Sequence, residues 1–156
     1  IRELCRHAKG ALEVVHNGNE KSALVALDSA LENDRLADFL IGTDAPAGSG
    51  VQPNGMLRMA TLLASIGDLP AEQAWCCGSG NVTKRRGLEQ GILEAGRPAD
   101  IVFLDRPSGS DGDNVLGAMS IGNIPGIAAV MIDGKIRTGR SRSTPPAHRI
   151  PLPVNS

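Results

Sequence analysis

The sequence predicts an α/β fold, and three consecutive segments support this prediction. Residues 11–16 form a short run rich in β-branched side chains, which ends at the turn-forming pair Asn17-Gly18. Residues 20–32 place Ala and Leu at three- and four-residue spacing, as in an amphipathic helix, and Asn19 can cap it. Residues 39–41 are all apolar, which is typical of a strand buried on both faces. A strand, a helix and a second strand in this order predict a βαβ unit with parallel strands.

A single carboxylate follows the second of these strands. Gly42 and Pro46 end the apolar run, so Asp44 is expected at the C-terminal end of the strand. In α/β barrels and in open α/β sheets, ligands bind at this end of the strands. Asp also commonly stabilises a turn through its own side chain. Local sequence alone favours the turn role for Asp44 and leaves the catalytic role open.

The loop after the second strand is long for a compact domain. Residues 45–55 are rich in Gly, Pro and Ser, and a loop of this kind is usually either functional or disordered. Its position directly after the carboxylate predicts the wall of a site, with Ala45, Pro46 and Ser49 as candidate substrate-binding residues. His16 ends the first strand at the same edge and is a fourth candidate. A solvent-facing turn histidine is the alternative for that residue.

The rest of the chain is expected to add helices and then a small β layer. The expected elements are a buried helix at 55–67, a helix from Pro70 to about Arg86 that stops at Gly87, a short strand within 90–98, a strand at 99–105, a helix at 114–121 and a hairpin at 127–137 that turns at Asp133-Gly134. Asp100 and Asp105 flank a strand and are expected to serve turns. Residues 140–156 are expected to form an extended arm over the surface.

Composition and charge narrow the range of partners. Sixteen basic and seventeen acidic residues give a net charge of −1, so no overall field attracts nucleic acid or an anionic membrane surface. No apolar stretch approaches the ~20 residues that span a bilayer, and a small molecule is therefore the expected partner. Cys5, Cys76 and Cys77 match neither a disulfide framework nor a metal-ligand spacing, which is typical of reduced thiols in a cytoplasmic protein. Because a helical pattern starts at Ile1, we expect an N-terminally truncated fragment.

Several short segments resemble, in their order and spacing, the C-terminal half of the amidohydrolase superfamily. They are Asp44 after its strand, Pro53-Asn54-Gly55 and Leu69-Pro70-Ala71-Glu72 at helix starts, Gly91-Ile92-Leu93-Glu94-Ala95-Gly96, Pro98-Ala99-Asp100-Ile101-Val102 and Ile132-Asp133-Gly134-Lys135. A second set is similar to one enzyme within the superfamily: Gly18-Asn19, Asp44-Ala45-Pro46, Gly80-Asn81, Ile124-Pro125-Gly126-Ile127 and Thr144-Pro145-Pro146-Ala147. The resemblance is strongest from about residue 39 to residue 148.

The resemblance implies both a fold and a site. The fold is the C-terminal portion of a metal-dependent (β/α)8 (TIM-type) barrel plus part of a small β-sandwich. Residues 1–87 would form the last β/α units of the barrel, 88–139 the sandwich part and 140–156 the C-terminal arm. Asp44 matches the aspartate at the end of the eighth strand, which implies roles as metal ligand and proton shuttle. The implied cofactor is a divalent metal, zinc or iron, with one or two ions whose other ligands lie outside this chain.

Two functions remain open at this point. In the first, the chain belongs to an enzyme, expected to be a homo-oligomer at full length, that hydrolyses a non-peptide C–N bond in a small nitrogen-containing molecule such as a cyclic amide, lactam or enamide. In the second, it is a catalytically silent fragment or a structural module, because one carboxylate cannot hold a catalytic metal. His7, His16 and His148 match none of the ligand positions that the resemblance implies.

Overall fold

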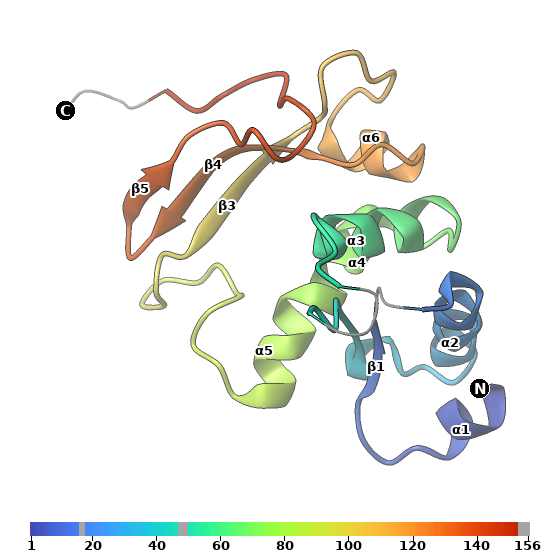
Figure 1. Ribbon diagram of the computed structural model, residues 1–156. Helices are drawn as coiled ribbons and strands as arrows, with labels where there is room; N and C mark the ends of the chain where they lie inside the picture. The colour runs from blue at the N-terminus through green and yellow to red at the C-terminus, as the bar shows by residue number, and fades with distance from the viewer. Residues whose placement is uncertain (16–17, 47–49, 153–156) are drawn as a thin grey trace.

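The computed structural model describes residues 1–15, 18–46 and 50–152. A two-stranded parallel sheet with its helices comes first in the chain, and a three-stranded antiparallel sheet follows (Figure 1). In chain order the elements are α1 (Arg2–His7), β1 (Leu12–Val15), α2 (Glu20–Glu32), the 3-10 turn η1 (Leu36–Asp38), β2 (Phe39–Gly42), α3 (Gly55–Ser65), α4 (Ala71–Gly78), α5 (Gly80–Arg86), β3 (Ile101–Asp105), α6 (Val115–Ser120), β4 (Gly126–Ile132) and β5 (Lys135–Thr138). The predicted α/β class is confirmed. No helix in the described ranges is long and apolar enough to span a membrane.

The first sheet is the βαβ unit that the sequence predicts. β1 and β2 pair in parallel, with Leu12 opposite Phe39. α2 connects the two strands and begins at Asn19, whose Oδ1 accepts a hydrogen bond of 3.1 Å from the Ser22 N–H. Helices α3, α4 and α5 contact β2, and three consecutive side chains of that strand are buried. The continuous apolar run of β2 is therefore explained by burial on both faces.

The main core lies between β2 and the helices that cover it. Its fully buried large side chains include Leu27, Phe39, Met59, Leu63, Cys77 and Met119. Gly78 permits a close approach of α4 to β2, because a Cβ at this position would lie 3.2 Å from the Cδ1 of Ile41. α6 joins the second part of the chain to this core, and the Trp75 Nε1–H of α4 donates a 3.0 Å hydrogen bond to the Met119 sulfur.

The single helix predicted from Pro70 to about Arg86 is wrong, because the structure has two helices. Pro70 precedes the first helical residue of α4, and the backbone leaves helical geometry at Ser79 (φ −134°, ψ −87°). The break falls between two glycines, which weaken helical preference. The Ser79 hydroxyl donates a 2.8 Å hydrogen bond to the Trp75 carbonyl oxygen, which this break leaves available. α5 ends where predicted, at Gly87 in the left-handed region (φ 65°).

The short strand predicted within residues 90–98 is also wrong. This segment contains no strand, only bends, turns and irregular backbone, and the backbone is left-handed at Gly91 and Gly96 (φ 88° and 91°). Gly91 lies against the end of α4, where a Cβ would be 3.4 Å from the Ser79 carbonyl oxygen. The Thr83 hydroxyl donates a hydrogen bond to the Gln90 carbonyl oxygen. A helix side chain, rather than a neighbouring strand, therefore satisfies this part of the backbone.

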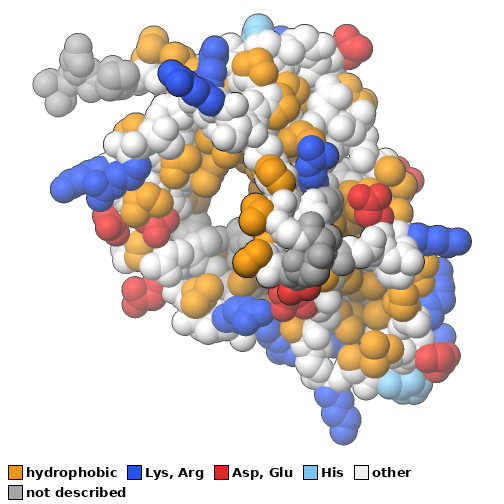
Figure 2. Space-filling view, in the orientation of Figure 1, with side chains coloured by type: hydrophobic (Ala, Val, Ile, Leu, Met, Phe, Trp, Pro, Cys, Tyr) orange, Lys and Arg blue, Asp and Glu red, His pale blue; other side chains and the backbone are white. Residues whose placement is uncertain are grey.

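The small sheet has the strand order β3-β4-β5, and its pairs are antiparallel. The predicted hairpin is confirmed, since Asp133 and Gly134 connect β4 to β5 with φ values of 51° and 70°. Val102, Ile132 and Ile136 of this sheet are each at least 40% exposed. Figure 2 shows a hollow between the sheet and α3 that is rimmed by hydrophobic side chains. The described residues thus leave apolar surface of the small sheet uncovered.

Part of the C-terminal segment is packed rather than lying loosely over the surface. Ala147 is fully buried and forms an antiparallel bridge with Pro107. The Ser108 N–H donates to the Pro146 carbonyl oxygen, and the His148 N–H donates to the Arg106 carbonyl oxygen, each at 2.9 Å. Residues 146–148 therefore extend the chain alongside the segment that follows β3.

Asn81 links α5 to the start of β2, and its replacement should destabilise the protein. Its Nδ2 donates to the carbonyl oxygens of Leu36 (2.9 Å) and Phe39 (3.1 Å). Asn81→Leu leaves both carbonyls without this donor, so we expect the free energy of unfolding to fall by about 1–3 kcal/mol, measured by urea denaturation. Asn33→Leu is the control, because the exposed Asn33 donates to only one carbonyl, that of Ser29. Equal losses in the two variants would contradict this role for Asn81.

Candidate functional site

Asp44 lies two residues beyond the C-terminal end of β2, as the sequence predicts. It is exposed, and its backbone is in the left-handed region (φ 52°), which Asp tolerates better than most residues. The Thr43 Oγ1 accepts a 3.3 Å hydrogen bond from the Ala45 N–H, which helps to turn the chain away from the strand. The Ala45-Pro46 peptide bond is cis. Asp44 therefore lies just beyond the C-terminal end of β2, the end of a parallel strand at which ligands commonly bind in α/β proteins.

The other sequence candidates are only partly described. Ala45 and Pro46 follow Asp44 directly and are both exposed, so they remain beside the carboxylate. His16 and Ser49 lie outside the described residues. Substrate binding by all four residues therefore stays a prediction.

The start of α3 supports the loop that carries Asp44. A Cβ at Gly55 would lie only 2.7 Å from the Cγ2 of Thr43, so the close contact between these segments requires glycine. Asn54 precedes α3 in the left-handed region, and its Nδ2 donates a 2.6 Å hydrogen bond to the Ser143 carbonyl oxygen. The motif Pro53-Asn54-Gly55 thus positions the strand end and ties it to the C-terminal segment.

The described residues do not form a complete metal site. Within residues 1–15, 18–46 and 50–152, no group of three or more His, Cys, Asp and Glu side chains could hold a metal ion. His7 is exposed and lies 3.4 Å from the Glu3 carboxylate, on the first helix. The carboxylate of Asp44 is a suitable oxygen ligand for a divalent metal, but it can supply only part of a ligand set. Any metal at this position needs further ligands from elsewhere.

Cys77, the second of the two adjacent cysteines of α4, is not a reactive nucleophile. Cys77 is buried, and desolvation together with the neighbouring Cys76 raises the pKa of its thiol to about 12. Its sulfur lies 3.3 Å from the Gln73 carbonyl oxygen, to which the thiol donates. Because the thiolate is the nucleophilic form, Cys77 is inert at neutral pH.

This environment predicts strongly unequal alkylation of the cysteines. At pH 8, iodoacetamide should modify the exposed Cys76 quickly, whereas Cys77 and the buried Cys5 should react only after unfolding. Mass spectrometry of peptides from timed reactions measures each rate. Comparable rates at Cys76 and Cys77 in the native protein would contradict the burial described for α4.

Asp105, which the sequence predicts to serve a turn, is the last residue of β3 and forms an ion pair with Arg149. The Asp105 side chain is 8% exposed. Its Oδ2 accepts from Arg149 Nε (2.9 Å) and the Arg149 N–H (2.8 Å), and its Oδ1 accepts from Arg149 Nη2 (2.9 Å) and the Arg106 N–H (2.9 Å). The Arg149 hydrogen bonds hold the pKa of the carboxyl well below its usual range. Asp105 therefore holds the C-terminal segment against the end of β3. No local sequence pattern indicates that its partner lies 44 residues away.

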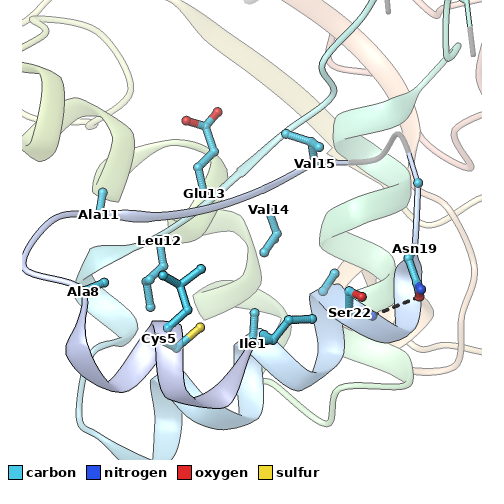
Figure 3. Close-up of a pocket in the computed structure, with 14 residues that line it drawn as sticks. Ile1, Cys5, Ala8, Ala11, Leu12, Glu13, Val14, Val15, Asn19 and Ser22 are labelled. Atoms are coloured by element: carbon cyan, nitrogen blue, oxygen red, sulfur yellow. Dashed lines mark hydrogen bonds between the residues drawn. The ribbon is translucent and has the colours of Figure 1, made fainter. Parts of the chain in front are cut away.

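An apolar groove of about 470 Å³ runs along β1 and the helices α1 and α2. In Figure 3, β1 passes over the two helices, Leu12 and Val14 point toward them, and Glu13 points to the opposite side. The Glu13 carboxylate instead pairs with Arg86 of α5 at 2.9 Å. In the described sheet β1 pairs only with β2, so its other edge borders this groove.

Known proteins resemble this chain over most of its length. The chain is 41% identical over 139 residues to an enamidase of Eubacterium barkeri, an alignment that covers 89% of this chain and 36% of the enamidase. It also superimposes on the crystal structure of enamidase, described as a member of the amidohydrolase superfamily, with a TM-score of 0.91 and 38% identity, over 95% of this chain and 38% of that one. The chain therefore spans little more than a third of the length of these relatives.

A more distant structure shares the fold alone. A β-aspartyl dipeptidase of Fervidobacterium islandicum AW-1 matches 81% of this chain and 32% of its own, with a TM-score of 0.53 and 18% identity. No protein-family model matches the sequence. The one enzyme to which the second set of short motifs is similar is enamidase, and the two enamidase matches confirm it. This chain is thus homologous to the C-terminal part of enamidase, a member of the amidohydrolase superfamily.

Proposed function

We propose that the protein acts as an amidohydrolase that cleaves a non-peptide C–N bond in a small nitrogen-containing molecule, such as a cyclic amide, lactam or enamide. The observation that carries this proposal is the position of Asp44. It lies just beyond a parallel strand, within a region that superimposes on enamidase with a TM-score of 0.91. Carboxylates at this end of parallel strands commonly take part in catalysis.

The proposed full fold is a TIM-type barrel with a small β-sandwich. Residues 1–87 would supply the last β/α units of the barrel, residues 88–139 part of the sandwich and residues 140–156 the C-terminal arm. The apolar groove beside β1 supports this arrangement, because a further strand and helix docked there would cover Ile1 and Leu4, which are 53% and 71% exposed. The uncovered apolar side chains of the small sheet support a second sandwich layer in the same way.

In this proposal Asp44 moves the proton. Its carboxylate would take a proton from the attacking water and later donate it to the leaving nitrogen, which requires hydrogen-bond reach to both. A bound divalent metal, zinc or iron, supplies a water of lowered pKa near neutral pH. Asp44 would contribute one oxygen ligand to one or two such ions, and the remaining ligands would come from residues outside this chain. Ala45, Pro46, Ser49 and His16 would contact the substrate.

A structural or catalytically silent module is the second candidate. The absence of a metal-ligand cluster among the described residues favours it. The two candidates differ in what they require outside this sequence. The enzyme needs further metal ligands elsewhere in the same reading frame, whereas the module needs none. The proposed enzyme would be a cytoplasmic homo-oligomer.

The experiment expresses the complete reading frame and measures bound metal and turnover together. After dialysis against zinc or ferrous iron, we expect about one or two metal ions per protomer by mass spectrometry. The same preparation should hydrolyse at least one compound in a panel of simple lactams, cyclic amides and enamides. A folded protein that retains no metal and hydrolyses none of these compounds would establish the silent module instead.

A further inference from the structure

Thr43 lies between the end of β2 and Asp44, and both branches of its side chain make contacts. Its Oγ1 accepts the 3.3 Å hydrogen bond from the Ala45 N–H, so the hydroxyl spans the backbone of Asp44. Its methyl group faces the start of α3, because a Cβ at Gly55 would lie 2.7 Å from the Thr43 Cγ2. The residue is half-buried. Thr43 therefore joins the strand, the turn and α3 at one position.

The two contacts hold one rotamer of Thr43. A β-branched side chain is stiff at χ1, and rotation about this bond moves the hydroxyl and the methyl group together. A rotation that carried the methyl group away from Gly55 would also carry the hydroxyl away from the Ala45 N–H. Each contact therefore keeps the side chain in the orientation that the other contact needs.

The backbone of Asp44 has a conformation that needs support. Its φ of 52° lies in the left-handed region, which costs energy for residues that carry a Cβ. Such a conformation persists where the surrounding structure holds it. On the strand side of Asp44, Gly42 pairs with Val15 of β1. On the other side the Thr43 hydroxyl binds the next peptide group, so the backbone is restrained before and after Asp44.

We propose that Thr43 is a positioning residue for Asp44, and that its hydroxyl fixes the direction from which the Asp44 carboxylate reaches the reacting atoms. This inference rests on the proposed hydrolase function, in which Asp44 takes a proton from water and returns it to the leaving nitrogen. Proton transfer requires hydrogen-bond distances to both, and a misplacement of about 1 Å can lower a rate about 100-fold. Thr43 contacts no reacting atom in this role and acts through the backbone of Asp44.

The experiment uses the complete reading frame and separates the two branches of the side chain. Thr43→Val keeps the branched shape but removes the hydroxyl, whereas Thr43→Ser keeps the hydroxyl and removes the methyl group. We expect Thr43→Val to lower kcat by about 10–100-fold with KM within about twofold of the parent, because the carboxylate is misplaced while the substrate-binding residues are unchanged. Thr43→Ser should keep at least about a third of the parent kcat.

Gly55→Ala tests the same rotamer from the side of α3. Gly55 is the first residue of the helix, where alanine is a favourable residue. The new Cβ would displace the Thr43 Cγ2 and with it the hydroxyl, so kcat should fall. Addition of Thr43→Ser removes the atom that the new Cβ meets first, and kcat should rise at least about fivefold above that of Gly55→Ala alone. A general disturbance of α3 would not be relieved by this second substitution.

Hydrogen exchange at the Ala45 amide gives a measurement that does not depend on turnover. In the same preparations, mass spectrometry of deuterated peptides should show faster exchange at Ala45 in Thr43→Val and an unchanged rate in Thr43→Ser. Thr61→Val is the matched control, because Thr61 lies on α3 and its Oγ1 has no hydrogen-bond partner among the described residues. This control should leave both kcat and the exchange at Ala45 unchanged.

The outcomes distinguish this inference from the proposed function. If the parent hydrolyses no compound in the panel, the proposed function fails, and exchange at Ala45 still supports or overturns the restraint of Asp44 by Thr43. If Asp44→Asn is inactive but Thr43→Val has the kcat of the parent, the hydrolase function stands and the positioning role is overturned. Unchanged exchange at Ala45 in Thr43→Val would also overturn that role, whatever the kinetics.

Discussion

Replacement of Asp44 by asparagine should lower the turnover of the proposed hydrolase by about 10²–10⁴-fold. Asparagine keeps the size of the side chain and tolerates the left-handed backbone at this position (φ 52°). It cannot accept and return a proton, so the loss should fall on kcat/KM while the melting temperature stays near that of the parent. Steady-state kinetics on the best substrate from the panel, with metal content measured in parallel, provides the test.

Asp68→Asn is a matched control for this substitution. Asp68 is also an exposed aspartate in the left-handed region (φ 49°), in the turn between α3 and α4. Asp68→Asn changes the same chemical group in the same backbone conformation, but away from the strand end. The activity of this variant should equal that of the parent. An Asp44→Asn enzyme with more than a tenth of the parent activity would remove Asp44 from the chemistry and return it to the role of a turn residue.

Replacement of Asp105 by asparagine should destabilise the protein by about 2 kcal/mol at pH 7. The carboxylate accepts four hydrogen bonds, two of them from the Arg149 guanidinium. An asparagine amide would turn an N–H group toward donors, and charged hydrogen bonds are individually strong. Solvent screens this ion pair and limits the loss, because the Arg149 side chain is 73% exposed. Urea unfolding measures the change.

The same pair predicts how stability depends on pH. The pKa of Asp105 is lower in the folded protein than in the unfolded chain, where it is about 3.9. The folded state therefore binds fewer protons, and this contribution is fully present above about pH 5 and is lost as the pH falls below 4. The difference in unfolding free energy between the parent and Asp105→Asn should shrink steadily as the pH is lowered from about 5 to below 4.

Asp100→Asn is the control for the measurement at pH 7. Asp100 precedes the opposite end of β3 and accepts one hydrogen bond, from the Asp133 N–H. Asp100→Asn removes one hydrogen bond rather than four, so it should lower the free energy of unfolding at pH 7 by less than Asp105→Asn does. If Asp105→Asn were as stable as the parent at pH 7, the ion pair between Asp105 and Arg149 would contribute nothing to the free energy of unfolding.

The parts of the fold that the sequence predicts are those with local causes. Asn19 caps α2 through a bond to Ser22 three residues later, and the apolar run of β2 reflects its own burial. The turn at Asp133-Gly134 follows from the backbone that these two residue types accept. In each case the deciding interaction lies within a few residues, so a pattern in one stretch is sufficient.

The features that the sequence misses depend on distant contacts. Residues 90–98 have the composition of a strand between glycines, but Thr83 and the end of α4 hold them as turns. Arg149 reads as one cation in a proline-rich tail until β3 places Asp105 beside it. Asn81 carries no local sign that it bonds to carbonyls more than forty residues earlier.

The candidate site lies between these two cases. The position of Asp44 follows from the strand and the residues that end it, and the structure places it there. Its chemistry does not follow from position alone, because a proton shuttle needs a partner that orients and activates the water. Within the described residues no metal-ligand cluster supplies that partner. The role of Asp44 therefore depends on residues that a single strand end cannot specify.

The ion pair between Asp105 and Arg149 also affects the order in which the chain can fold during translation. Arg149 leaves the ribosome 44 residues after Asp105, a delay of roughly 2–9 s at typical rates of translation. During that interval the strand carrying Asp105 has no cover from residues 146–148. The βαβ unit has all of its own residues by then and can fold first. The small sheet is consequently without this cover until residues 146–149 have been made.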